Sequence, residues 1–156
     1  MMRKEHFYNV EMNWIGNIGT GTSSYSAYKR DFDISGTDKP TIPGSSDPAF
    51  RGDKRRYNPE ELLVASLSAC HMLWYLHLCA EAGVVVLKYE ENASGVMQET
   101  EDGSGFFRDV TLNPVVTVSE TSMIETAIDL HKKANEMCYI AKSCNFPVHH
   151  KPTIGI

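Results

Sequence analysis

The chain has 156 residues, of which 42% are hydrophobic and 22% charged, and its formal net charge is -5. This composition indicates neither disorder nor a fibrous repeat, and the length is too short for two cores of ordinary size, so we expect a single domain over residues 1–156. An acidic balance is the wrong sign for holding nucleic acid or an anionic membrane, which leaves small molecules or proteins as the expected partners.

Four cysteines are too few for a disulfide scaffold, and no Cys-x-x-Cys pair suggests a zinc ribbon or a thioredoxin-like site. The basic residues Arg3 and Lys4 are not followed by an apolar stretch of signal-peptide length. We therefore expect a cytoplasmic protein whose cysteines are thiols. Each thiol is either a small buried hydrophobe or a reactive group.

The first third of the chain predicts a β-meander followed by a long loop. Residues 6–15 alternate in polarity as a strand does, three glycines from Gly16 to Gly21 predict a turn, and residues 23–32 predict a second strand. Residues 33–57 are rich in glycine and proline, which favours a long, ordered loop of the kind that often serves a site.

A long helix is predicted from Asn58 to Gly83. An Asn N-cap, Pro at the first helical position and two acids in the first turn are a strong opening. Between Glu61 and Glu81 no side chain carries a formal charge, so the helix is apolar nearly all round and needs cover on every side. A membrane span is disfavoured because polar residues interrupt the run and no second hydrophobic segment accompanies it.

The second half of the chain predicts strands over residues 84–89, 93–98 and 106–118, with a hairpin turn at 101–105. Ser122-x-x-Glu125 is a capping box that opens a second helix, which carries Cys138, and residues 148–156 predict a last strand. Two helices and five or six strands give an α+β fold. Because one other helix can hardly enclose an apolar helix, a second copy should complete the cover, and the sequence predicts a homodimer.

Cys70 lies in the middle of the long helix among small and apolar residues, where a buried structural cysteine is the ordinary interpretation. Reactivity requires more, since lowering a thiol pKa by two units takes about 2.7 kcal/mol of differential stabilisation of the anion. Cys70 is about three turns from the helix N-terminus, beyond the reach of the macrodipole, so a nearby cation is needed.

The loop before the helix supplies candidate cations. An Arg folded over Cys70 is favoured over a Lys, because the planar guanidinium is always charged and can contact both a thiolate and a peroxide oxygen. Glu60 could hold such an Arg, although an ordinary first-turn helix acid is the alternative. The basic residues of this loop are Arg51, Lys54, Arg55 and Arg56.

The run from Asn58 to Leu63, followed by Ser68-Ala69-Cys70, resembles the central helix of the OsmC/Ohr family of osmotically inducible and organic hydroperoxide resistance proteins. The order of predicted elements is similar over nearly the whole chain. The resemblance implies an OsmC-like fold, an intertwined homodimer, and thiol-dependent reduction of organic hydroperoxides and, to varying degrees, hydrogen peroxide. It implies no metal and no bound cofactor, and an external thiol reductant such as a dihydrolipoyl-type dithiol.

The same resemblance assigns roles to individual residues. Cys70 matches the peroxide-attacking Cys and Glu60 matches the acid that orients a catalytic Arg. Cys138 matches the resolving Cys, but Tyr139 replaces the usual Pro after it, which leaves Cys144 as a rival. For the Arg, the family's OsmC branch has it just before an aromatic, whereas here Phe50 precedes Arg51. Arg51 is the first choice and Arg56 the second.

Two other classes of function stay open. A non-catalytic OsmC-like dimer could bind a small apolar ligand. A metal site is disfavoured because neither candidate set has paired Cys-x-x-Cys spacing, and a Cys-His hydrolase is disfavoured because adjacent helical residues point about 100° apart. The candidate metal sets are Cys138, Cys144, His149 and His150, or Cys70, His71, His77 and Cys79.

Overall fold

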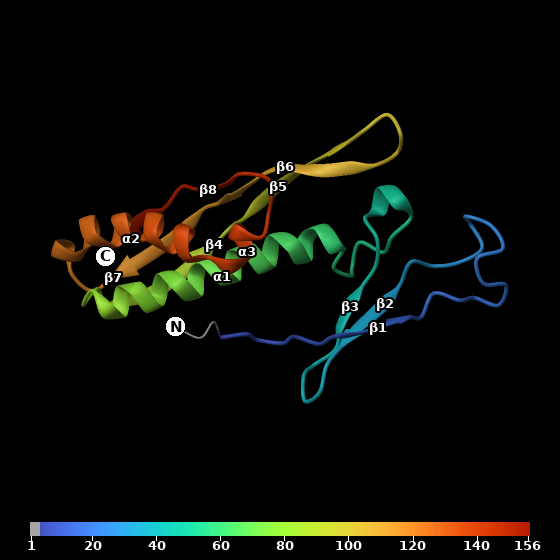
Figure 1. Ribbon diagram of the computed structural model, residues 1–156, viewed down its shortest axis with the longest axis horizontal. Helices are drawn as coiled ribbons and strands as arrows, with labels where there is room; N and C mark the ends of the chain where they lie inside the picture. Colours follow the sequence, from blue (N-terminus) through green and yellow to red (C-terminus); the bar gives the residue numbers. More distant parts are fainter. Residues whose placement is uncertain (1–3) are drawn as a thin grey trace. The chain divides into compact units, whose positions relative to one another are not determined.

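The computed structural model describes residues 4–156 (Figure 1). The chain forms two compact units, the first ending at Leu62 and the second beginning at Leu63. The prediction of a single domain stays a prediction, and Arg3, which entered the leader argument, lies outside the described residues.

The first unit contains a three-stranded antiparallel sheet in the order β1 (Glu11–Trp14), β2 (Phe32–Ser35) and β3 (Ile42–Gly44). The sheet is a β-meander, but only its first strand lies wholly in a segment predicted as a strand, and that strand is much shorter than the predicted span of residues 6–15. A Cβ at Gly44 would clash with the Phe32 ring.

The predicted second strand at residues 23–32 is wrong. Most of that segment is loop, and Arg30 donates hydrogen bonds of 2.7 Å to the carbonyl oxygens of both Tyr25 and Tyr28. The apolar residues of the segment are spaced three and four apart instead of two, so they never formed a strand pattern. The predicted loop over residues 33–57 is only partly correct, since it holds most of β2, all of β3 and the 3-10 turn η1 (Pro48–Phe50).

The long helix α1 (Pro59–Glu81) begins as the sequence predicts. The Glu61 N–H donates to the side-chain oxygen of Asn58 at 2.8 Å, and the Asn58 N–H donates to the Glu61 carboxylate at 3.1 Å. These reciprocal bonds satisfy two backbone donors that no helical carbonyl can reach.

The second unit contains two three-stranded sheets. Strands β4 (Val86–Glu91) and β7 (Pro114–Val118) pair antiparallel, as do β5 (Ser94–Glu99) and β6 (Gly105–Leu112), and the predicted hairpin turn joins the last two. The predicted strand at 106–118 is in fact two strands, because the chain leaves one sheet at Asn113 and enters the other.

The C-terminal segment also divides, into β8 (Val148–His150) and β9 (Thr153–Gly155). The single predicted strand is thus two strands, and these pair parallel with β6 and β7. Pro152 lacks an N–H for a ladder bond, which explains the break between the two strands.

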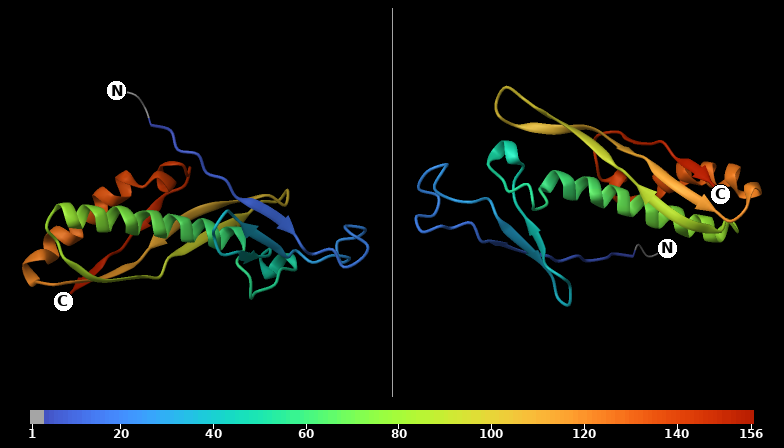
Figure 2. Two further views of the ribbon diagram at one scale, coloured as in Figure 1. Left: turned by 90° about the horizontal axis from the view of Figure 1, so that it is seen from below. Right: turned by 180° about the vertical axis from the view of Figure 1, so that it is seen from behind.

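The second helix is α2 (Ile124–Met137), preceded by the 3-10 turn η2 (Thr121–Met123) and followed by α3 (Tyr139–Lys142). The predicted capping box is wrong. Ser122 already lies inside the 3-10 turn, and its hydroxyl contacts the Glu120 carboxylate at 3.4 Å. α2 lies alongside α1 (Figure 2).

Within the chain α1 buries one face. Leu67 and Tyr75 are fully buried, whereas Leu73 on the opposite face is 64% exposed. The expected cover on every side is therefore not supplied by the described residues of one chain. By length and composition alone α1 could cross a membrane, but its buried face belongs to the core of a folded unit. The residues that pack around Tyr75 in this core are Leu78, Cys79, Val84, Val116, Val118, Ala127 and Ala134.

Candidate functional site

Two of the four thiols meet in the second unit. Cys70 is partly buried on α1, and Cys138 is 1% exposed where α2 gives way to α3. The Cys138 thiol lies within hydrogen-bonding reach of the Cys70 thiol. Burial, together with the neighbouring Cys70 thiol, raises the pKa of Cys138 to about 11. The structure thus brings together the two cysteines that the resemblance pairs.

The local sequence explains why Cys138 points inward. The buried residues of α2 are Ala127, His131 and Ala134, spaced four and three apart, and Cys138 continues this stripe by four more residues. At Cys138 the backbone becomes extended, with ψ 111°, so the residue ends α2 instead of lying within it as predicted. The N–H of Ala141 then donates to the Cys138 sulfur at 3.4 Å.

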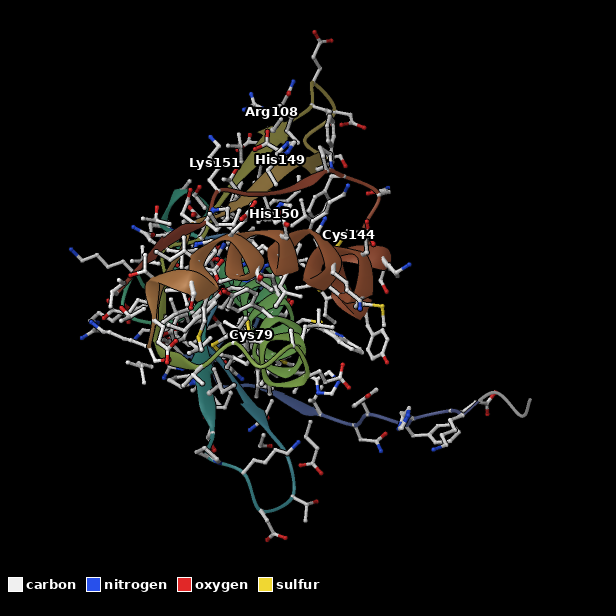
Figure 3. All side chains as sticks on the ribbon, turned by 90° about the vertical axis from the view of Figure 1, so that its left-hand side faces the viewer. Cys79, Arg108, Cys144, His149, His150 and Lys151 are labelled. Atoms are coloured by element: carbon white, nitrogen blue, oxygen red, sulfur yellow. The ribbon has the colours of Figure 1, made fainter. Side chains whose placement is uncertain are left out.

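Cys144, the rival for the resolving role, lies after α3 and packs against the smaller core cluster around Leu67. Burial raises the pKa of its thiol, and no neighbouring group contributes to that rise. In Figure 3 the labelled Cys144 lies beside α3, apart from the labelled Cys79 on α1. The geometry therefore favours Cys138 over Cys144 as the neighbour of Cys70.

The other two predicted site residues, Arg51 and Glu60, belong to the first unit. One carboxylate oxygen of Glu60 is buried and has no hydrogen-bond partner within residues 4–156. A buried carboxylate oxygen without a partner is costly, and a cation is the partner that compensates best.

Arg51 has a left-handed backbone with φ 68°, held by its N–H donating to the Pro48 carbonyl at the end of η1. A non-glycine residue in this conformation costs about 1–3 kcal/mol, and such strain is concentrated at functional positions. The Arg51 guanidinium lies 5.9 Å from the centroid of the Tyr25 ring. It forms no salt bridge within the described part of the chain.

The neighbouring arginines are already occupied. Arg56 contacts the Asp33 carboxylate at 3.2 Å and donates to the Phe32 carbonyl at the same distance. Arg55 pairs with Asp53 at 2.7 Å, and this hydrogen bond holds the pKa of Asp53 well below its usual range. Arg51 is thus the arginine of this segment that stays available to another anion.

An apolar cavity of about 210 Å³ is lined by Leu73, Trp74 and His77 on α1. Trp74 lies one helical turn after Cys70, and its ring packs edge-on against Tyr139, directly after Cys138, at 5.6 Å. The cavity is therefore adjacent to the segments that carry both thiols.

Sequence reasoning missed a buried pair of imidazoles. His71 Nε2 and His131 Nδ1 are 3.0 Å apart and share a hydrogen bond, and both side chains are 1% exposed. The prediction that His71 is poorly placed to serve Cys70 agrees with this geometry, because its ring faces α2. The burial of His71 could have been predicted from the sequence, because His71 lies four residues from both Leu67 and Tyr75 and so shares their face of the helix. Its partner His131 could not.

Neither proposed metal set assembles. Within residues 4–156 no group of three or more His, Cys, Asp or Glu side chains is arranged to hold a metal ion. The histidines of the helix set diverge, since His71 is buried against α2 while His77 lies on the exposed face and contacts Glu81 at 3.5 Å.

The second unit has an α+β fold built on a long core helix, α1. This helix carries the thiol of Cys70, and the buried thiol of Cys138 lies next to it. Together they define a two-thiol site. The chain belongs to the OsmC-like protein family, whose family model matches residues 52–152. The predicted α+β, OsmC-like fold is thereby confirmed.

Solved structures agree with this assignment. An OsmC-like protein of unknown function from Vibrio cholerae is 25% identical, with a TM-score of 0.81 over 96% of this chain and 100% of its own. An OsmC-like protein from Mycoplasma pneumoniae is 13% identical, with a TM-score of 0.72 over 98% of this chain and 100% of its own. An organic hydroperoxide resistance protein from Elizabethkingia anophelis is 18% identical, with a TM-score of 0.67 over 97% of this chain and 99% of its own. No curated protein matches the chain.

Proposed function

We propose that the protein is a thiol-dependent peroxidase that reduces organic hydroperoxides, with Cys70 as the attacking thiol and Cys138 as the resolving thiol. The observation that carries the proposal is that the buried thiol of Cys138 neighbours the partly buried thiol of Cys70. Membership of the OsmC-like family and the name of the Elizabethkingia anophelis relative, an organic hydroperoxide resistance protein, support it.

The reaction has three steps. The Cys70 thiolate attacks the distal peroxide oxygen, the O–O bond breaks, and the alkoxide takes up a proton to leave as an alcohol. The Cys138 thiol then condenses with the Cys70 sulfenic acid, which forms a disulfide and releases water. An external dithiol, for example of the dihydrolipoyl type, restores both thiols by exchange. The chain itself needs no metal or bound cofactor for this sequence.

In this proposal Arg51 supplies the cation that Cys70 needs. Its guanidinium is free of carboxylate partners within residues 4–156, and it sits on a backbone turn that fixes its starting direction. The unpartnered buried oxygen of Glu60 is a suitable acceptor for that guanidinium. The positive charge would favour the thiolate and stabilise the leaving alkoxide.

The cavity at Leu73, Trp74 and His77 is a suitable place for the alkyl part of a hydroperoxide, because it is apolar and lies one turn from Cys70. Hydrogen peroxide lacks this apolar part and should be the poorer substrate. The same cavity favours a second candidate function, in which a non-catalytic OsmC-like dimer binds a small apolar ligand. Both functions fit a cytoplasmic homodimer.

Free-thiol titration separates the two functions. The reduced chain has four thiols, and one equivalent of cumene hydroperoxide should remove two of them if the protein is a two-Cys peroxidase. Excess dithiol should restore all four. A simple ligand-binding protein would keep all four thiols at every hydroperoxide concentration, and that result would exclude the peroxidase.

A further inference from the structure

Three aromatic side chains stack in the core between α1 and α2. The His131 ring lies parallel to the Tyr75 ring with centroids 3.7 Å apart, and it stacks with the His71 ring at 5.3 Å. His71 and His131 also share the hydrogen bond of 3.0 Å between Nε2 and Nδ1. This polar contact joins the middle of α2 to α1.

The two thiols depend on the same pair of helices. His71 directly follows Cys70 on α1, and His131 lies two helical turns before Cys138 on the buried stripe of α2. A shift of α2 along or away from α1 would therefore displace the Cys138 thiol together with the His131 ring. Since a disulfide needs Cα atoms within roughly 7 Å, a small displacement is enough to prevent its formation.

We infer that the buried pair His71–His131 positions Cys138 against Cys70, so that disulfide formation depends on this pair staying uncharged and hydrogen-bonded. The inference relies on the proposed function for peroxide as the natural oxidant. Neither imidazole touches the reacting sulfurs in this scheme, and both are positioning residues.

The surroundings of the pair accept only neutral rings. His71 Nδ1 and His131 Nε2 are both buried and have no hydrogen-bond partner within residues 4–156. Neither ring forms a salt bridge in the described part of the chain, so a charge on either would be buried and unpaired. Accordingly, burial lowers the pKa of His71 to about 4 and that of His131 to about 3.

The titratable groups that contact the pair supply no negative charge to compensate a protonated ring. His150 on β8 packs edge-on against His71 at 5.6 Å, and burial lowers its pKa. The Tyr75 ring stacks on the His131 ring, and burial raises the pKa of the Tyr75 hydroxyl. The nearby Glu91 on β4 instead accepts a hydrogen bond of 2.8 Å from Tyr89.

Amide substitutions isolate the role of the imidazoles. Gln at position 71 places an amide near Nε2, and Asn at position 131 places one near Nδ1, so His71→Gln and His131→Asn keep a hydrogen-bonding atom but cannot be protonated. His131→Leu removes the bond altogether. His149→Gln, at an exposed position of β8 outside the cavity, is the matched control.

The test follows two events after mixing reduced protein with one equivalent of cumene hydroperoxide. Loss of alkylatable Cys70 reports its oxidation, and peptide mapping without reductant reports the Cys70–Cys138 disulfide. The rate of disulfide formation in each variant is divided by the wild-type rate at each pH from 4 to 8. This division cancels the ionisation of the thiols, which is common to all variants. A parallel series uses diamide, a two-electron thiol oxidant that joins nearby thiols without peroxide chemistry.

At pH 7.5 His131→Leu should slow disulfide formation about tenfold, the effect of losing one buried hydrogen bond from the aligned state, while Cys70 oxidation keeps its wild-type rate. As the pH falls towards the lowered pKa of His71, about 4, His71→Gln and His131→Asn should outpace the wild type by a growing factor, and the control His149→Gln should not. A ratio that stays constant for both amide variants across the whole pH range would overturn the inference. If hydroperoxide leaves all thiols free while diamide gives the same pattern of variants, the proposed function fails and the positioning role stands.

Discussion

Arg51 is the side chain on which the reactivity of Cys70 depends in this account. Its neighbour Arg56 is engaged with Asp33 and a backbone carbonyl, whereas Arg51 has a strained backbone and no carboxylate partner within residues 4–156. A guanidinium near a thiolate acts as a fixed opposite charge, which lowers a thiol pKa by favouring the anion.

Arg51→Ala should therefore slow the oxidation of Cys70 about 10- to 100-fold, since losing about 1.4–2.7 kcal/mol of stabilisation of the attacking thiolate and the leaving alkoxide corresponds to that change in rate. The rate at which alkylatable Cys70 disappears after mixing with cumene hydroperoxide measures the effect. Arg56→Ala is the matched control and should mainly reduce stability through loss of the Asp33 contact. An equal oxidation rate in Arg51→Ala and the parent protein would transfer the role to another cation.

The pH dependence of stability follows from His71 and His131. Both folded-state pKa values lie below the ordinary value of 6.5, so below pH 6.5 the unfolded chain binds more protons than the folded chain. Their contribution to the free energy of unfolding is therefore constant above pH 6.5 and falls with decreasing pH, by at most about 1.4 kcal/mol per pH unit and histidine. The raised pKa of Glu91 acts in the opposite direction.

Urea denaturation at pH 7.5 and pH 5 should show a larger loss of stability at pH 5 for the wild type than for the double variant His71→Gln/His131→Asn. The comparison at equal pH leaves the contribution of Glu91 in both proteins. The same loss in both would mean that the two imidazoles are solvated in solution.

At the scale of elements, the start of α1 is a feature that the sequence predicts in full. The reciprocal bonds between Asn58 and Glu61 should be worth about 1 kcal/mol, so Asn58→Ala should lower the urea midpoint measurably. Asn58→Ser is the control, because Ser is an equally good N-cap and should retain most of the stability. A full loss with Ser would show that Asn58 acts through another contact.

Local signals explain which elements could be predicted and which could not. The first strand, α1 and the inward direction of Cys138 follow from alternation, caps and helical periodicity, all of which act over a few residues. The parallel pairing of β8 and β9, and the contact of His71 with His131 across 60 positions, arise from packing between distant segments. A short sequence pattern does not predict such contacts. The strand prediction for residues 23–32 was wrong because Tyr25 and Tyr28 stack on Arg30 instead of alternating along a strand.

At the scale of the whole molecule, the exposed apolar face of α1 favours association with a second copy of the chain. Leu73 on this face is 64% exposed in the single chain. An apolar helix face that stays exposed to water promotes association or aggregation. We expect a homodimer by sedimentation at micromolar concentration. Leu73→Asp should weaken the dimer, whereas Ile128→Asp, at a position on α2 that is 46% exposed, should leave it intact. A well-behaved wild-type monomer would contradict the prediction.

The central claim is that Cys70 and Cys138 form one redox pair. The most direct measurement treats the reduced protein with one equivalent of cumene hydroperoxide, blocks the remaining thiols and maps the peptides by mass without reductant. The account predicts a disulfide between Cys70 and Cys138 within a single chain, with Cys79 and Cys144 alkylated, and no disulfide after the substitution Cys70→Ser. A dominant link from Cys70 to Cys144, or an oxidised Cys70 with Cys138 still free, would contradict it.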